Sequence, residues 1–581
     1  MRAGIRRAIL VMLMLAAAAP QARAASQDGN FDALSHDFLG EWLARRPQAA
    51  TRLGDHSHDS ELYAITPQSV ASDLEWLREM QELLAAIPRE KLSFERQLDR
   101  DVLASRIERE ILELSEVRSW ARNPNTYVDL VSSPIQALLQ RDFAPLCNRI
   151  QSATRRLRAV PEILRAAPLN LDHPPTIYTE IAIAQLDGVL TFYRVTLGAL
   201  TAECREPRLQ ADLAEADTAA VKAVEAFRRT LKDEVLARSD SSFALGASLY
   251  ARKLAADEMD RTPLDTLLAQ AWRELEATDA RMKLLAERIA PGGGVQAALD
   301  SLAQGAPSES QLVPAVSGEL DAIRAFLRKK DLLTMPSREN LIVRETPPFR
   351  RSLSFASMDA PGVWDKNGTQ AYYNVTPVDP AWSAQQKRDH LAFFNRWSAA
   401  LVSIHEALPG HYYQYLANRN VPFPIRQAFG SASGSEGWAH YCEQMAIEAG
   451  FGDGDPRYEF AQLYLAMQRL GRFVVGISLH TKGMTYDEAV TLFEERCYMP
   501  PVNAAREARR GTSDPTYLVY TLGKWRILAL REECRTALGD RFSLRDFNDA
   551  VVAQGPVAAP VLRAAVLRAL GVRAPRPPKS R

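Results

Sequence analysis

Apolar residues recur at three- and four-residue spacing through most of this 581-residue sequence, with charged residues between them. This spacing puts apolar side chains on one face of an α-helix, and it is typical of amphipathic helices that pack on a shared core. The pattern runs from Phe31 to about Lys329 and returns from Ser383 to about Leu570. We therefore expect a mainly α fold. The clearest segments are Pro67 to Ile87, Phe94 to Val117 and Pro207 to Val235.

Prolines and glycines divide this helical pattern. Thr66 is placed as the N-cap of the first of these segments, with Pro67 at the first helical position. Proline and glycine disfavour the interior of a helix, so they are expected to mark connections. Such connections are predicted at Pro161, at Pro174-Pro175 and at Pro291-Gly292-Gly293-Gly294.

A short β-prone region follows Pro336. It comprises Asn340 to Thr346, Arg351 to Ser357 and Ala371 to Thr376, with the tight-turn sequence Lys366-Asn367-Gly368 before the last run. We expect a small sheet of two or three strands. The chain is long enough for two packed subdomains. We predict an N-terminal helical region over 25–335 and a catalytic helical region over 336–581, joined in one continuous fold.

The N-terminal residues have the pattern of a secretory signal peptide. Arg2, Arg6 and Arg7 precede an apolar run from Ala8 to Ala19, and Ala22-Arg23-Ala24 offers small residues at both cleavage positions. Cleavage is expected after Ala24, which assigns residues 1–24 to the signal and predicts a periplasmic or secreted protein. The apolar run is too short for a permanent membrane span. No cysteine follows it, so no lipid anchor is expected there, and no stable membrane insertion after cleavage.

Charge and cysteine content narrow the possible partners. The 71 basic residues balance the 71 acidic ones, which argues against nucleic acid or an anionic membrane as a partner. The five cysteines form no Cys-x-x-Cys pair and no disulfide framework. We expect most of them to be buried thiols, while one or two bridges and the oligomeric state stay open. They are Cys147, Cys204, Cys442, Cys497 and Cys534.

The first part of a candidate metal site is a His-Glu pair followed by a second histidine: His405, Glu406 and His411. Zinc peptidases bind the metal with two such imidazoles, and the glutamate beside the first serves as general base. Their usual spacing is four residues, whereas here it is six. Six residues turn a straight helix by about 240°, which would point His411 away from His405. Pro409-Gly410 can break or bulge the helix and bring the two rings together.

The second part lies 23 residues after His411, in the segment from Gly434 to Glu443. It is predicted to begin a helix, with Ser435 as the cap. Glu436, His440 and Glu443 then share one face. Because catalytic zinc usually takes three protein ligands, Glu436 is the expected third ligand. His440 and Glu443 are expected to support the ligands or to contact substrate.

These motifs resemble those of the bacterial "domain of unknown function 885" family, DUF885. The resemblance extends to Pro47-x-x-Ala50-Thr51-x-Leu53-Gly54-Asp55-His56 and to Asp514-Pro515-x-Tyr517-x-x-Tyr520-x-x-Gly523-Lys524, so it covers nearly all of the mature chain. Its core is His405-Glu406-x-x-Pro409-Gly410-His411-x-x-Gln414 with Ser435-Glu436-Gly437-Trp438-Ala439.

The family is similar to helical zinc peptidases of the thimet-oligopeptidase and carboxypeptidase Taq type. The resemblance implies a helical bowl with a deep central cleft, a small β-sheet next to the metal-binding helix, metal dependence and peptide substrates. It also implies His405, His411 and Glu436 as ligands of one Zn²⁺ per chain, with Glu406 as base.

The remaining expectations concern residues around the site. A tyrosine or arginine is expected to stabilise the oxyanion of peptide hydrolysis, and the candidates are Tyr520, Tyr517 and Arg510, in that order; core packing is the alternative for the tyrosines. Arg509 or Arg510 could hold the C-terminal carboxylate of a substrate. The run from Tyr372 to Val375 is read as an edge strand that pairs with an extended peptide, or as an ordinary structural strand. His390 is expected at the surface.

The function predicted from the sequence is zinc-dependent hydrolysis of oligopeptides outside the cytoplasm. Endopeptidase, dipeptidase and carboxypeptidase activity remain open within it. One alternative is a non-catalytic helical binding or scaffold protein, which would be favoured if His440 were a fourth ligand. The other is a metal-dependent amidase that acts on cell-wall peptides. Zinc suits two imidazoles and a carboxylate, although cobalt or manganese can occupy the same ligands.

Overall fold

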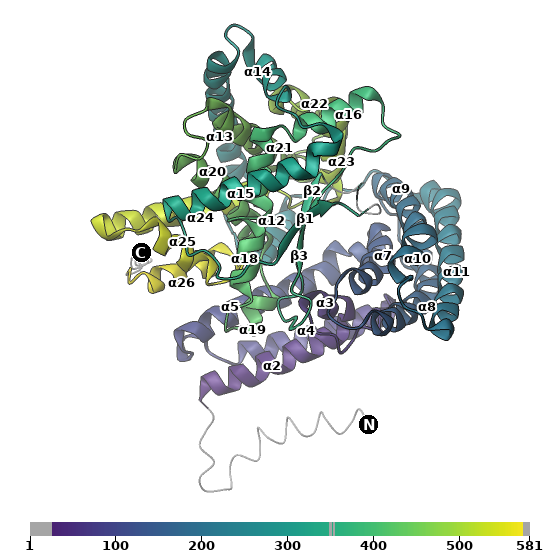
Figure 1. The fold of residues 1–581 in the computed structure, drawn as a ribbon. Coiled ribbons are helices and arrows are strands. Elements are labelled where there is room, and N and C mark those ends of the chain that lie inside the picture. Colours follow the sequence, from purple (N-terminus) through teal and green to yellow (C-terminus); the bar gives the residue numbers. More distant parts are fainter. Residues whose placement is uncertain (1–25, 348–350, 352–354, 573–581) are drawn as a thin grey trace.

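The fold is mainly helical and contains one small sheet (Figure 1). The structure, a computed structural model, describes residues 26–347, 351 and 355–572. The predicted signal peptide, residues 1–24, lies outside the described residues. None of the helices in the described ranges has the length and apolar character needed to cross a membrane.

The first half of the described chain forms helices connected by short turns. Three of them continue into a π-helical turn, at Glu113–Val117, Phe192–Thr196 and Leu231–Val235. The α-helices are α2 (Gln27–Arg45), α3 (Pro47–Leu53), α4 (Pro67–Ala85), α5 (Phe94–Leu112), α6 (Ser119–Arg122), α7 (Asn125–Gln140), α8 (Leu146–Asn170), α9 (Thr176–Thr191), α10 (Leu197–Thr201), α11 (Pro207–Thr230), α12 (Ala247–Glu258), α13 (Leu264–Ile289), α14 (Gly294–Ala303) and α15 (Leu312–Lys330).

The second half contains the sheet and then a second set of helices. The strands are β1 (Leu341–Glu345), β2 (Ala356–Asp359) and β3 (Ala371–Val375). The helices are α16 (Ala384–Phe393), α17 (Arg396–Glu406), α18 (His411–Asn418), α19 (Pro424–Ala428), α20 (Ala432–Glu448), α21 (Pro456–Thr481), α22 (Tyr486–Cys497), α23 (Pro501–Ser513), α24 (Val519–Leu538), α25 (Leu544–Val552) and α26 (Ala559–Ala569). Short 3₁₀ turns lie at Arg89–Lys91, Leu236–Arg238, Glu309–Gln311 and Gly539–Arg541.

The predicted helix boundaries agree closely with α4, α5 and α11. Helix α4 begins at Pro67 with Thr66 as its cap, and the side chains of Thr66 and Ser69 each bond to the other residue's backbone N–H. Such a capping box satisfies two N–H groups that the first turn of a helix leaves free. Helices α5 and α11 end in π-helical turns at Val117 and Val235, where the sequence pattern also ends.

Pro161 was predicted to lie in a connection, and this is wrong. It lies inside α8, whose buried side chains include Leu157, Val160 and Leu164. These side chains pack against α11 and α7, so tertiary packing outweighs the one backbone hydrogen bond that a proline removes. The predicted connection at Pro174-Pro175 separates α8 from α9. Of the predicted connection Pro291-Gly292-Gly293-Gly294, the first three residues separate α13 from α14, and Gly294 is the first residue of α14.

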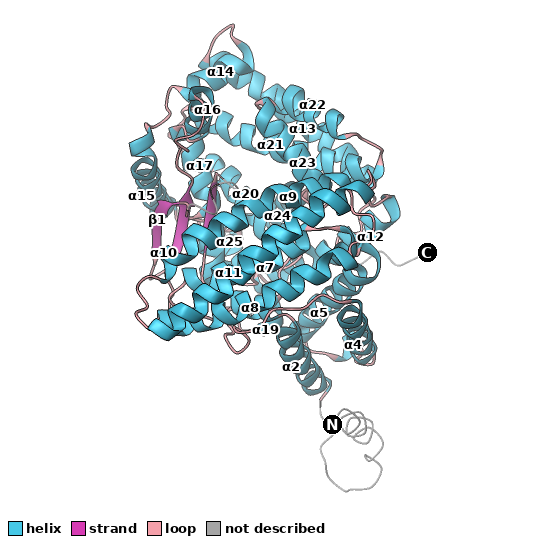
Figure 2. Ribbon diagram, turned by 90° about the vertical axis from the view of Figure 1, so that its right-hand side faces the viewer, coloured by secondary structure: helices cyan, strands magenta, loops and turns pink. Residues whose placement is uncertain are grey.

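The apolar side chains form two buried clusters. The larger cluster joins helices from both ends of the chain, for example through Phe38 and Trp42 of α2, whose rings contact Phe429 edge-on. The smaller cluster lies among α7, α8, α9 and α11, which run side by side in Figure 2. The helices that carry the candidate site belong to the larger cluster.

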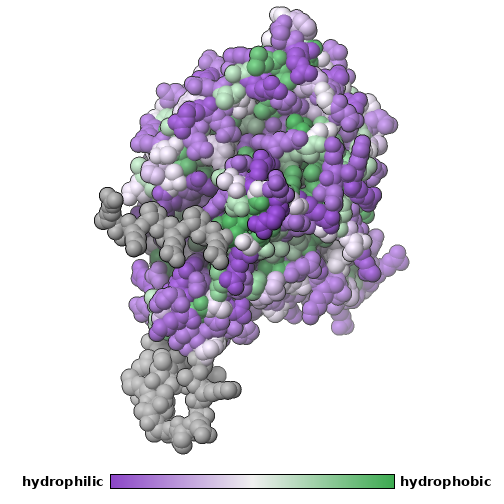
Figure 3. Space-filling model, turned by 90° about the vertical axis from the view of Figure 1, so that its left-hand side faces the viewer, coloured by the Kyte–Doolittle hydropathy of each residue, from purple (hydrophilic) through white to green (hydrophobic). Residues whose placement is uncertain are grey.

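The face of the molecule in Figure 3 is mainly hydrophilic, with small hydrophobic areas between the hydrophilic ones.

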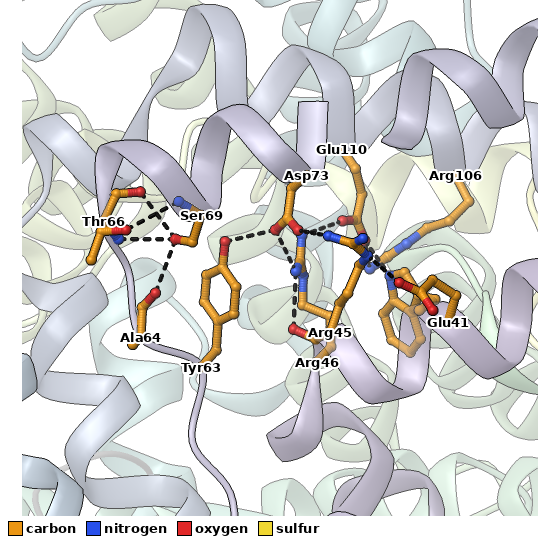
Figure 4. A network of polar contacts seen from close by, with 11 residues as sticks. Glu41, Arg45, Arg46, Tyr63, Ala64, Thr66, Ser69, Asp73, Arg106 and Glu110 are labelled. Atoms are coloured by element: carbon orange, nitrogen blue, oxygen red, sulfur yellow. Dashed lines mark hydrogen bonds and ion pairs between the residues drawn. The ribbon is translucent and has the colours of Figure 1, made fainter. Parts of the chain in front are cut away.

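A buried polar network connects the first helices. The carboxylate of Asp73 on α4 accepts hydrogen bonds from Arg45, at 2.8 Å, and from Arg46, at 2.7 Å. The Tyr63 hydroxyl donates a third, at 2.6 Å, and Arg46 also reaches Glu110 on α5. Figure 4 shows Asp73 between the tyrosine and the two arginines. A buried carboxylate destabilises the fold unless it is paired, so breaking these contacts would be costly. They therefore hold the α2–α3 junction against α4 and α5.

The smaller cluster also contains a disulfide bond. It joins Cys147 at the start of α8 to Cys204 after α10, across 57 residues of sequence. The sequence left this pairing open. Cys442, Cys497 and Cys534 are free and buried, as expected.

Removing this disulfide is expected to destabilise the protein. A Cys147→Ser/Cys204→Ser variant should lose about 2–4 kcal/mol in the free energy of unfolding, because the bond restricts a long loop in the unfolded chain. Urea denaturation of the wild type and the variant, each with and without reductant, measures the loss. Reductant should bring the wild type to the midpoint of the variant and leave the variant unchanged. A wild-type midpoint that reductant does not move would contradict the prediction.

The sheet has the strand order β1-β3-β2, with β1 parallel and β2 antiparallel to β3. Of the two interpretations of Tyr372 to Val375, the edge strand is therefore wrong and the ordinary structural strand is confirmed. This run is β3, the central strand, and most of its side chains are buried. Strand β2 begins at Ala356, later than the predicted start at Arg351, and much of 351–357 lies outside the described residues. Lys366 to Gly368 lies in the longer connection between β2 and β3.

His390 was expected at the surface, and this is also wrong. Its ring is buried among Phe355, Trp382 and Phe394, and its Nε2 lies 2.8 Å from the carbonyl oxygen of Thr376. Helix α16 looked polar in isolation. The end of β3 and the residues around it cover this one position of the helix, and a local sequence pattern cannot show such a contact.

Candidate metal centre

The turn between α17 and α18 brings the two histidines of the motif together. Helix α17 ends at Glu406, the Leu408–Pro409 peptide bond is cis, and α18 begins at His411. The rings of His405 and His411 lie 4.8 Å apart between centroids, at 84° to one another. The six-residue spacing is thus accommodated by ending one helix and starting another.

Hydrogen bonds and close packing define the shape of this turn. The N–H of Gly410 donates to the carbonyl of Ile404 at 3.0 Å, and Trp438 of α20 donates to the carbonyl of Pro409 at 2.8 Å. A Cβ atom at Gly410 would lie 1.8 Å from the carbonyl oxygen of His405. The turn therefore requires a residue without a side chain at this position.

Gly410→Ala is expected to disrupt the centre. The added methyl group would collide with the backbone of α17 and displace His411. We expect a loss of about 1–3 kcal/mol in stability, as in overpacked cores, together with loss of metal binding. Urea denaturation and metal analysis measure the two effects. Gly318→Ala in α15 is the matched control, because a Cβ there meets nothing within 4 Å. An alanine variant at 410 that binds metal like the wild type would contradict the role assigned to this turn.

Glu436 comes from α20, which begins earlier than predicted. The N-cap is Ser431, whose hydroxyl accepts the N–H of Gly434 at 2.9 Å, so the prediction of Ser435 as cap is wrong. The serine- and glycine-rich chain before Glu436 is itself helical. Glycines in α20 allow this helix to pack closely on its neighbours. A Cβ at Gly437 would lie 2.3 Å from Gly523 of α24.

Three donor atoms converge at the centre. Oε2 of Glu436 lies 3.3 Å from Nε2 of His405 and 3.3 Å from Nε2 of His411, and a ligand atom of each residue lies within 4.8 Å of the others. This oxygen is buried, yet it makes no hydrogen bond of acceptable geometry. Ligands about 2.0–2.2 Å from zinc at tetrahedral angles lie roughly 3.3–3.5 Å from one another. The two carboxylate–imidazole distances, the donor chemistry and the unsatisfied oxygen are compatible with a zinc ion.

Glu443 orients the ring of His405. Its Oε1 lies 2.8 Å from Nδ1 of His405, which directs Nε2 of that ring toward Glu436. Burial disfavours the charge of Glu443, but Arg469 and the neighbouring rings hold its pKa well below the usual range. A carboxylate on the far nitrogen of a ligating imidazole fixes its tautomer and makes it a better donor.

His440 does not join the three donors. Its ring is fully buried, its Nδ1 lies 3.2 Å from Glu443, and its Nε2 makes no hydrogen bond. Burial holds the pKa of His440 well below its usual value, so the ring is neutral. Among the described residues, the cluster at this centre has three members, not four.

Glu406 lies beside the three donor residues without belonging to the cluster. Its Oε2 accepts the backbone N–H of Met358, on β2, at 2.9 Å. Burial raises the pKa of Glu406, and the rings of His411 and His405 oppose this. The small sheet therefore holds one oxygen of the carboxylate at the edge of the centre.

The predicted oxyanion partners separate into two groups. The Tyr520 ring stacks on His405 with 6.5 Å between centroids, and the Tyr520 hydroxyl accepts a hydrogen bond from Arg510 at 3.4 Å. Burial raises the pKa of Tyr520, so it keeps its proton at neutral pH. Tyr517 is buried and packs against Gly476 and Gly511 away from the centre.

Two cavities meet at the centre. One has a volume of about 460 Å³ and the other of about 870 Å³. Both are lined by His405, Glu406 and Tyr520. The smaller also touches β2 through Ser357 and Met358. A ligand that spans both cavities would pass His405, Glu406 and Tyr520.

Two groups of the centre could not be identified from the sequence. Arg469, on α21, lies 3.3 Å from Nδ1 of His405 and pairs with Glu443 at 2.9 Å. It stands in an ordinary amphipathic segment with no motif around it. The N–H of Met358 is a backbone group, so its role cannot be recognised from the residue type. A weak signal for Arg469 was its place on the apolar face of α21, where an arginine needs a partner.

Comparisons with known proteins agree with the fold. Residues 47–566 match the family model described as "Bacterial protein of unknown function (DUF885)". Two solved structures cover nearly the whole chain. A candidate lipoprotein of unknown function from Shewanella oneidensis is 24% identical, with a TM-score of 0.78 over 92% of this chain and 99% of that one. A candidate lipoprotein from Colwellia psychrerythraea is 18% identical, with a TM-score of 0.80 over 94% and 100%. No functionally curated protein matches the sequence significantly.

Proposed function

We propose that this chain, which belongs to the DUF885 family of bacterial proteins, is an exported zinc-dependent peptidase that hydrolyses oligopeptides. The observation that carries the proposal is the convergence of His405, His411 and Glu436 with Glu406 beside them. Two imidazoles and one carboxylate are the ligand set of several catalytic zinc sites, which leave one position open for water or substrate. The absence of His440 from the cluster argues against a four-ligand structural site.

Each side chain has a role in this mechanism. The metal, when bound, supplies Lewis acidity for the scissile carbonyl and lowers the pKa of water. His405, His411 and Glu436 would hold it, and Glu443 keeps Nε2 of His405 directed at it. Glu406 would accept a proton from the attacking water and pass it to the leaving amine.

The neighbours of Glu406 support this assignment. Because Met358 occupies Oε2 of Glu406, Oε1 is left for proton transfer. Tyr520 lines both cavities and keeps its proton, and in this mechanism its hydroxyl would donate to the developing oxyanion.

Strand β2 offers a way to hold an extended peptide. It is an edge strand, and Met358 directs its N–H away from β3 and toward Glu406. Ser357, Met358 and Ala360 line the smaller cavity. A peptide could extend the sheet through backbone groups of this edge other than the N–H of Met358, which Glu406 already accepts. We therefore propose that β2, and not Tyr372–Val375, pairs with an extended peptide substrate.

Two observations support export. The structural neighbours are described as candidate lipoproteins, which are proteins of the cell envelope. The Cys147–Cys204 disulfide fits an oxidising compartment. Both agree with the signal-peptide pattern of residues 1–24.

The test is hydrolysis of a peptide library by the protein that begins at Ala25, loaded with zinc. Mass spectrometry of the products should show peptide cleavage that a chelator abolishes and added zinc restores. A parallel reaction with cell-wall peptide fragments separates a general peptidase from a wall amidase. If the zinc-loaded protein cleaves neither library peptides nor wall fragments, the proposed function is wrong.

A further inference from the structure

The larger cavity has an unusual wall beside the metal centre. Helices α21 and α23 contribute four arginines to the lining of this 870 Å³ space. Among the described residues that these two helices place in the lining, Glu507 is the one carboxylate. The arginines are Arg469, Arg472, Arg506 and Arg510.

Carboxylates hold two of these arginines in fixed positions. Arg472 makes two hydrogen bonds of 2.8 Å with Glu507, and its side chain is 15% exposed. Arg469 is held by Glu443, which lies outside the cavity, and its Nε is buried without a hydrogen bond. The guanidinium groups of Arg472 and Arg469 are therefore already engaged by carboxylates.

The wall concentrates positive charge around Tyr520. The guanidinium carbons of Arg472, Arg469 and Arg510 lie 5.0, 5.7 and 5.9 Å from the centre of its ring. Arg506 stands one helical turn before Arg510, on the same face of α23. Burial, and then the nearby guanidinium groups of Arg510 and Arg472, lower the pKa of Arg506. Positive groups gathered in this way favour a negatively charged ligand.

The other surfaces near the centre lack such charge. No lysine or arginine of the described chain lines the smaller cavity. In the larger cavity the acidic residues besides Glu507 come from other helices: Asp300 from α14, Asp389 from α16, Glu406 from α17 and Glu494 from α22. The partner of Arg510, Asp514, does not line the cavity, and the Arg510 side chain remains 39% exposed. The larger cavity therefore carries arginines on one wall, whereas the described lining of the smaller cavity carries none.

We propose that the arginine-lined cavity binds a carboxylate group of the peptide substrate, with Arg506 and Arg510 as its main contacts. The proposal rests on the proposed peptidase function. The carboxylate can come from the free C-terminus of the peptide or from an aspartate or glutamate side chain. In either case, binding of the carboxylate in this cavity determines the side of the metal centre on which that part of the substrate lies.

The test measures binding to the zinc-loaded Glu406→Gln variant, so that no turnover is needed. Peptides that the wild type cleaves are labelled at the N-terminus and prepared in matched pairs. One pair differs only in a C-terminal carboxylate or amide, and the other in a glutamate or glutamine side chain. We expect one of the two neutral forms to bind about 10- to 100-fold more weakly, as charge-assisted hydrogen bonds require. That preference should shrink when Arg506→Gln or Arg510→Gln is added.

Arg509→Gln serves as the matched control. Arg509 stands on the same helix, lines neither cavity and pairs with Glu180 at 3.3 Å, so its loss should leave the preference unchanged. A preference lost on amidation identifies the C-terminal carboxylate, and one lost with glutamine identifies a side chain. Equal binding of all forms, or a preference that both arginine variants retain, would overturn the proposal while peptide cleavage by the wild type stands. Failure of the wild type to cleave any peptide would instead remove the proposed function and this proposal with it.

Discussion

Glu406→Gln is expected to reduce kcat for peptide hydrolysis by about 10²- to 10⁴-fold, the usual contribution of a general base. Glutamine has nearly the shape of glutamate, so its amide oxygen can still accept the N–H of Met358, which bonds to Glu406 at 2.9 Å. The ligand atoms of His405, His411 and Glu436 do not include Glu406. Zinc content should therefore remain at the wild-type level while the catalytic rate falls.

Steady-state kinetics and metal analysis on the same preparation test this expectation. KM should change much less than kcat, because Glu406 acts on the proton of the attacking water and not on the peptide chain. Glu276→Gln, an exposed position of α13, is the control and should behave like the wild type. A Glu406→Gln enzyme with more than about a tenth of wild-type kcat would contradict the assignment of the base.

The sequence predicted those features that depend on local chemistry. The three-to-four residue periodicity predicted α4, α5 and α11, because a helix buries one face whatever its neighbours are. The six-residue spacing of His405 and His411 looked incompatible with one helix, and Pro409-Gly410 predicted the break that resolves it. Gly410 is informative because its surroundings leave no room for a Cβ, and a glycine in that position can be recognised from sequence.

Features that depend on which surfaces meet could not be predicted in this way. Tyr517 and Tyr520 stand three residues apart, yet one packs in the core and the other stacks on His405. The choice is made by the packing of α24 against α20 and α21. His390 is buried because the end of β3 covers it. These contacts join different elements of the fold, and the periodicity of one helix does not encode them.

The metal ligands themselves give the second large expected effect. His411→Ala and Glu436→Ala should each reduce zinc from about one ion per chain to close to none, because two remaining ligands hold the metal far less tightly than three. In the wild type, zinc at 100 times its dissociation constant should stabilise the fold by about 2.7 kcal/mol. The variants should lack this gain in the free energy of unfolding. Thermal unfolding with and without a chelator measures it, alongside metal analysis.

His440→Ala separates a catalytic from a structural metal site. Because Nε2 of His440 makes no hydrogen bond and lies outside the three-donor cluster, this variant should keep its zinc even if the buried cavity lowers its stability. His36→Ala, an exposed position of α2, controls for loss of an ordinary histidine. Zinc lost equally from the His440 variant would indicate a fourth ligand, and with it a structural ion. A wild-type protein that binds no zinc when it is supplied would remove the peptidase mechanism, since Glu406 would then have no activated water beside it.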